Sequence, residues 1–89
     1  MRAIITVIGT DRVGIIAGVS AILADANVNI LDITQTIMQG FFTMIMVVDV
    51  SKSAVSFEQL AGKLESKGNE LGIQIKIQRE DIFNSMHRI

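Results

Sequence analysis

A short polar loop near the N-terminus carries the residues best suited to bind a small ligand. Its sequence is Thr10-Asp11-Arg12-Val13-Gly14-Ile15, and it joins an apolar run to a segment with helical periodicity. A loop that opens a helix presents backbone N–H groups without intrahelical partners, and the helix dipole adds partial positive charge behind them. Gly14 lacks a Cβ, so a ligand could approach the backbone closely there. These features favour a cradle for a small anionic or zwitterionic ligand. The alternative is an ordinary strand-to-helix turn capped by Asp11.

The rest of the sequence offers little catalytic or metal-binding chemistry. His87 is the only histidine, and it has no acidic or nucleophilic neighbour that would form a catalytic dyad. Asp32 and Asp49 have no paired ligand at short range, so no metal site is expected. The glycines around the loop match neither the dinucleotide-binding nor the P-loop pattern. We therefore expect a protein that is not an enzyme and that uses no cofactor.

The composition limits the classes of partner. The 89 residues are 49% hydrophobic and 19% charged, which is apolar for so small a domain and predicts self-association, most simply as a homodimer. A formal net charge of −1, with no cluster of Lys and Arg and no Trp or Tyr, disfavours nucleic-acid binding. No apolar stretch approaches the ~20 residues of a membrane span. The absence of cysteine is compatible with a reducing compartment and favours a cytoplasmic protein.

Four segments have the sequence patterns of β-strands. Residues 3–8 and 41–50 are apolar on both faces, which is typical of strands in the middle of a sheet. Residues 28–39 mix apolar and polar positions in rough alternation, and residues 73–78 alternate cleanly, as edge strands do. Gln39 and Gly40 predict a tight hairpin turn between the second and third strands.

Two segments between these strands predict helices. Apolar residues recur at helical spacing from Ile15, and Asn27 ends this first helix because Asn accepts the left-handed conformation. The second helix begins at Ser56, where Gln59 three residues later completes a capping box. Gly72 ends it, for the same conformational reason as Asn27.

The order β-α-β-β-α-β predicts an α+β fold of the ferredoxin-like type in a single domain, residues 1–89. Residues 1–79 would form the core, and residues 80–89 a C-terminal amphipathic helix. Right-handed crossovers place the first and third strands in the centre of the sheet. Because both helices would cover one face, the other face needs a cover from the C-terminal helix or a partner subunit. The apolar stripe of that helix is Ile82, Phe83, Met86 and Ile89.

Two motifs together resemble the ACT domain, specifically the small stand-alone kind related to the ACT modules of glycine-cleavage regulators. They are Asp11-Arg12-Val13-Gly14-Ile15, and Asn27-Val28-Asn29-Ile30 at the opening of the second strand. The resemblance covers almost the whole chain. It implies a ferredoxin-like fold, regulation rather than catalysis, and an amino acid bound at a subunit interface between the first loop and the second strand. The site that it implies consists of Thr10, Asp11, Arg12, Val13, Gly14, Ile15, Asn29 and Ile30.

Two residues of the loop depart from the family pattern. Val13 stands where many members carry proline, so the loop is less fixed in φ. Asp11 stands where serine-sensing members carry asparagine, and its carboxylate would accept from a ligand ammonium but repel a ligand carboxylate. We therefore expect the helix N–H groups to hold the ligand carboxylate, Asp11 its ammonium, and the amide of Asn29 from a neighbouring strand or subunit to fix its orientation. The alternative function is a structural or protein-interaction subunit that binds no small ligand. The sequence does not name the protein partner that such a module would regulate.

Overall fold

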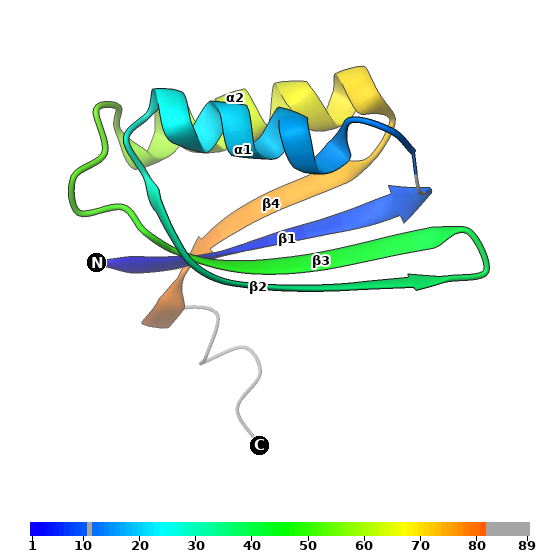
Figure 1. Cartoon of the computed structure of the whole chain (residues 1–89). Coiled ribbons are helices and arrows are strands. Elements are labelled where there is room, and N and C mark those ends of the chain that lie inside the picture. Colours follow the sequence, from blue (N-terminus) through cyan, green and yellow to red (C-terminus); the bar gives the residue numbers. More distant parts are fainter. Residues whose placement is uncertain (11, 82–89) are drawn as a thin grey trace.

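The computed structural model describes residues 1–10 and 12–81. In this part of the chain a four-stranded antiparallel sheet carries two helices on one face (Figure 1). The elements are β1 (Arg2–Thr10), α1 (Ile15–Asp25), β2 (Asn29–Met38), β3 (Phe41–Asp49), α2 (Phe57–Leu71) and β4 (Gln74–Arg79). The strands lie in the order β2-β3-β1-β4, so the first and third strands are central. The predicted ferredoxin-like fold is confirmed.

Local signals in the sequence set the ends of both helices. Ser56 Oγ accepts from the Gln59 N–H at 3.1 Å, and Gln59 Oε1 accepts from the Ser56 N–H at 3.0 Å, so the predicted capping box is present. Gly72 ends α2 in the left-handed conformation, with φ of 71°. Asn27, just after α1, has φ of 59°. These predicted helix boundaries are confirmed.

The turn between β2 and β3 forms where the sequence predicts it. Gln39 has φ of 52° and Gly40 has φ of 82°. Positive φ at both central residues is the geometry of the two-residue hairpin turn that matches the twist of the flanking strands. The turn fixes the register of β2 against β3, with Met38 opposite Phe41.

The hydrophobic core lies between the helices and one face of the sheet. Alternate residues of β1 and β3 point into it, among them Ile5, Val7, Met44 and Met46. The prediction that residues 41–50 are buried on both faces is wrong for the described chain. Phe41 is 64% exposed and Ile45 is 39% exposed, because the described helices cover only the opposite face (Figure 1).

The edge strand β2 is more exposed than the sequence predicts. All ten of its residues are exposed, where a half-buried strand was expected. The helices pack over the other strands, with α2 against β4 and α1 only at the margin of β2. Ile33 and Ile37 lie on the side of β2 that faces the helix layer. They nevertheless remain 43% and 58% exposed, respectively.

The end of β4 lies beside the start of β1. Arg79 pairs with Ala3 in the sheet, and Arg2 forms an ion pair of 2.9 Å with Glu80. Residues 82–89, which hold most of the predicted C-terminal helix and its whole apolar stripe, lie outside the described residues. Neither described helix is both long and apolar enough to cross a membrane.

Two glycines of α2 should respond oppositely to substitution by alanine. A Cβ at Gly68 would lie 2.8 Å from the Ile73 carbonyl oxygen, whereas a Cβ at Gly62 would meet no atom within 4 Å. We expect Gly68→Ala to lower the free energy of unfolding by about 1–3 kcal/mol, because backbone must shift. The matched variant Gly62→Ala should raise it by about 0.5–1 kcal/mol. Urea unfolding measures both, and equal effects would contradict the close approach of α2 and β4.

Candidate functional site

Helix α1 begins after a glycine. Gly14 occupies the N-cap position with φ of 96°, and among the described residues no side chain makes a cap hydrogen bond there. The first helical bond runs from the Gly18 N–H to the Gly14 carbonyl at 2.8 Å, so the earlier N–H groups of the helix lack intrahelical acceptors. A Cβ at Gly14 would meet no atom within 4 Å. Gly14 is therefore not held to glycine by a close neighbour among the described residues, and its positive φ is the feature that favours glycine.

The alternative prediction, an Asp11 cap, falls on a residue that lies outside the described residues. The N-cap position itself belongs to Gly14, three residues later. Thr10 ends β1 opposite Phe41, Val13 is 97% exposed, and Ile15 is buried in the core with its side chain away from solvent. Ile15 can thus offer a ligand its backbone but not its side chain.

Arg12 links the loop to the C-terminal end of α2 by a hydrogen bond. Its Nη1 donates to the Leu71 carbonyl at 2.6 Å. A guanidinium at this position satisfies a carbonyl of the last helical turn and complements the negative end of the helix dipole. Sequence reasoning placed Arg12 in the ligand site and missed Leu71, although Gly72 marks that helix end in the sequence.

A second contact ties the same loop to the same turn. A Cβ at Gly9 would lie 2.5 Å from Ile73 Cγ2, so glycine is what lets the end of β1 approach Ile73. Gly9 precedes the loop and Arg12 lies within it, and both contact residues 71–73. The backbone of the loop is thus positioned by the turn between α2 and β4.

The second part of the predicted site lies at the other end of the sheet. Asn29 pairs with Asp49, which pairs with Arg2, whereas the loop follows Thr10 at the opposite end of β1. The nine residues of β1 span about 27 Å at ~3.4 Å per residue. Ile30 lies beside Asn29 and is 37% exposed. Within one chain, therefore, the structure does not bring Asn29 and Ile30 to the loop.

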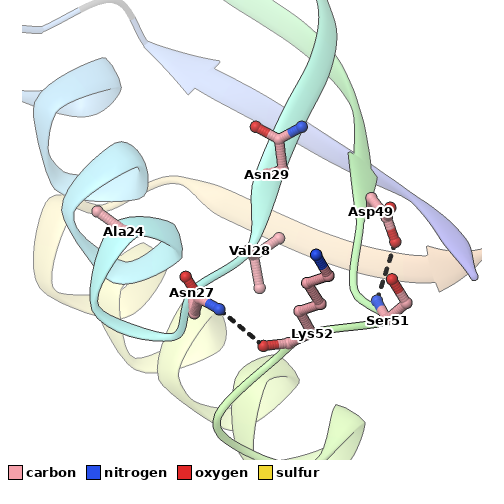
Figure 2. A pocket seen from close by; sticks show the side chains of 7 residues that line it. All are labelled: Ala24, Asn27, Val28, Asn29, Asp49, Ser51 and Lys52. Carbon is pink, nitrogen blue, oxygen red and sulfur yellow. Dashed lines mark hydrogen bonds between the residues drawn. The ribbon is translucent and has the colours of Figure 1, made fainter.

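A pocket of about 230 Å³ surrounds Asn29. Figure 2 shows Lys52 extending between the end of β3 and the start of β2, below Asn29. The pocket is lined by Ala24, Asn27, Val28, Asn29, Asp49, Ser51 and Lys52. Asn27 Nδ2 donates to the Lys52 carbonyl at 3.1 Å, which holds the loop after β3 against the end of α1. Sequence reasoning did not assign Ser51 or Lys52 to a site, because only the fold places them beside Asn29.

The carboxylate of Asp49 is held in its charged form. The Ser51 N–H donates to Asp49 Oδ1 at 2.9 Å, and the N-terminal ammonium lies 3.6 Å away. The hydrogen bonds from the Ser51 backbone and hydroxyl, followed by the N-terminal charge, lower the pKa of Asp49 below its ordinary value. Their stabilisation is present above that ordinary pKa and is lost as the pH falls through the lowered one. Within residues 1–10 and 12–81, no three side chains of His, Cys, Asp or Glu gather in a way that could hold a metal ion.

Comparisons with known proteins agree with this architecture. The sequence model of the ACT domain matches residues 2–78. A UPF0237 protein from Clostridium acetobutylicum is 64% identical over 89 residues, which is 100% of both chains. The structure of an ACT domain protein from Streptococcus pneumoniae is 44% identical, covers 93% of both chains and superposes with a TM-score of 0.80. These matches confirm the resemblance drawn from the two motifs.

A glycine-cleavage regulator shares the fold as well. The structure is described as that of a candidate glycine cleavage system transcriptional repressor. The two sequences are 24% identical, and the match covers 86% of this chain and 44% of the repressor chain, with a TM-score of 0.73. At this identity the match shows the fold alone.

Loss of the Arg12 contact should loosen both segments that it joins. We expect Arg12→Met to speed amide hydrogen exchange in residues 13–17 and 71–73 and to lower the free energy of unfolding by about 1 kcal/mol. Lys63→Met removes a cation from the exposed side of α2 and serves as the matched control. Exchange rates that change equally in the two variants would contradict the fastening role.

Proposed function

Because the chain belongs to the ACT domain family, we propose that it is a regulatory module that binds an amino acid between two copies of itself. The observation that carries this proposal is the N-terminus of α1, where Gly14 occupies the N-cap position and has no side chain to cap the backbone N–H groups. The other half of the predicted site, Asn29, is at the far end of the same sheet. A second copy is needed to supply it.

The β2 edge has the features of an association surface. In natural proteins, charged residues or proline on an edge strand usually prevent it from pairing with a strand of another molecule. β2 carries a single charged residue, Asp32, in ten, whereas β4 at the other edge carries Lys76 and Arg79 in six. Exposed apolar side chains add to the unpaired backbone of β2, including Ile33 and Ile37. These differences favour pairing through β2 rather than β4.

Two-fold antiparallel pairing of β2 with its copy would complete the site. In such a pair the first residues of one strand lie beside the last residues of the other. Met38, at the end of β2, lies at the same end of the sheet as Thr10, since both pair with Phe41. Asn29 of a second copy would therefore come to the end of the sheet that carries the loop and Gly14. The site would form only in the dimer.

The groups at this interface suit an amino acid. The first N–H groups of α1 and its dipole favour a carboxylate. The Asp11 carboxylate would accept from the ligand ammonium, and the Asn29 amide of the second copy can both donate and accept. Each contact is modest alone, and together they would orient a zwitterion. The absence of cysteine agrees with a cytoplasmic setting for such a sensor.

The second candidate function is a protein-interaction subunit that uses the same surface without a small ligand. The ten exposed residues of β2 support it equally well. The two functions differ in one respect, since only the first requires that a free amino acid bind and stabilise the dimer.

Association through β2 can be tested by placing a charged residue on this strand. We expect Ile37→Lys, at a position 58% exposed on β2, to weaken dimerisation at least about tenfold, because paired edge strands do not tolerate an uncompensated charge. The control Gln74→Lys places the same charge on the opposite edge and should leave the dimer intact. Analytical ultracentrifugation measures both, and a monomeric parent protein would exclude the interfacial site.

Ligand binding can be tested by calorimetry and thermal shift with each common amino acid, on protein stripped of carried-over ligand. Asn29→Ala should weaken binding by about 1–3 kcal/mol, since it leaves a buried polar group of the ligand unmatched. Asn69→Ala, at an exposed position of α2, is the matched control. Gly14→Val is a poor probe, because φ of 96° would strain any branched side chain. The absence of heat and of a melting shift at millimolar concentration would leave only the interaction subunit.

A further inference from the structure

The sheet face opposite the helices carries an apolar strip along its two central strands. Residues that pair across β1 and β3 share this face, so Ile4 lies beside Val47 and Thr6 beside Ile45. Ile8 is 46% exposed and Ile45 is 39% exposed, whereas Ile4, at the end of the strip nearest the exit of β4, is 6% exposed. The flanks are polar, with Gln74, Lys76 and Gln78 on β4 and Asp32, Thr34 and Thr36 on β2. An apolar centre with polar flanks is the pattern of a surface that receives one narrow amphipathic element.

The chain leaves β4 toward this face. After Arg79 the last described residues lie on the side of the sheet away from α1 and α2 (Figure 1). The ion pair between Arg2 and Glu80 holds this exit at the corner where β1 begins. Ile4 is two residues from Arg2 and pairs with Gln78 in β4. The described part of the chain therefore ends next to one end of the apolar strip.

We propose that residues 82–89 of the same chain are the occupant of this strip and lie on it as a short helix along β1 and β3. The apolar residues of the segment are Ile82, Phe83, Met86 and Ile89, spaced so that a helix would gather them on one side. Eight helical residues extend about 12 Å. The strip from Ile4 to Ile8 extends about 14 Å, so the segment and the surface match in length.

This arrangement decides which surfaces remain for association. A tail tethered at the edge of the strip has a high effective local concentration, so it competes well against a second molecule for the same surface. With the strip covered by its own chain, the β2 edge is the apolar surface left for a partner. The match with the Clostridium acetobutylicum relative extends over all 89 residues, whereas the ACT domain match ends at residue 78. The tail is thus a feature shared beyond the domain core.

Disulfide trapping tests the proposal cleanly, because the chain contains no cysteine. The variant Ile45→Cys with Met86→Cys places one thiol on the strip and one on the tail. On mild oxidation we expect an intramolecular disulfide in most molecules, seen as a faster-migrating monomer on a non-reducing gel and as a loss of two hydrogens by mass spectrometry. The matched control is Ile33→Cys with Met86→Cys. Ile33 is 43% exposed but pairs with Met46, so it faces the helix side.

Three outcomes would overturn the proposal. A disulfide that forms only between two chains would mean that the strip is covered by the tail of a second copy. No disulfide in the Ile45 variant would mean that the tail does not lie on the strip. Equal intramolecular trapping of the two variants would mean that the tail samples both sides of the sheet. None of these results depends on ligand binding, so the amino-acid proposal stands or falls separately.

A second pair of variants checks the apolar contact itself. Phe83→Asp adds a carboxylate on the apolar side of the tail, and Asn84→Asp adds one at the neighbouring position outside the apolar stripe. We expect the first to lower the melting temperature by at least about 5 °C and to increase the fluorescence of a dye that binds apolar surface, and the second to change neither. A Phe83→Asp variant that matches Asn84→Asp in both measurements would contradict burial of the tail.

Discussion

One-sided burial of the sheet governs this structure. Side chains of β1 and β3 alternate between the two faces, and only one face meets the helices. Fully buried residues such as Ile5 and Met44 supply the core on that side. Since the two described helices lie on one face, they leave β2 exposed and do not cover the opposite face of the sheet. Any cover for these two surfaces would therefore come from elements other than the two described helices.

The loop at the start of α1 depends on contacts made far away in sequence. Gly9 allows β1 to approach Ile73, and Arg12 donates to the Leu71 carbonyl. Both contacts fall on the turn that joins α2 to β4, so the N-terminus of α1 is positioned by the second half of the fold. A ligand that tightens this loop would also restrain that turn, which would give the proposed site a physical route to the β4 edge.

Much of the fold could be predicted because its signals are local. Ser56 with Gln59 and the left-handed Asn27 and Gly72 each act within a few residues, so the sequence alone contains their effect. Burial is different, because an apolar residue such as Ile45 is buried only if another element covers it. The candidate site was predicted at a subunit interface between the loop and the second strand, and within one chain Asn29 and the loop lie at opposite ends of the sheet. Register and subunit number decide such distances, and neither is encoded in a local pattern.

The ion pair of Arg2 and Glu80, with Ala3 beside Arg79, brings the first and last strands of the module to a common corner. A folded unit whose entry and exit points adjoin can be spliced into a surface loop of another protein with short connectors, since the host backbone is barely displaced. The same adjacency would let Arg2 and Glu80 be joined by a short connector and new ends be opened at the Gln39-Gly40 hairpin without breaking the sheet. Insertion into another protein and circular permutation would therefore require little displacement of the backbone in this architecture.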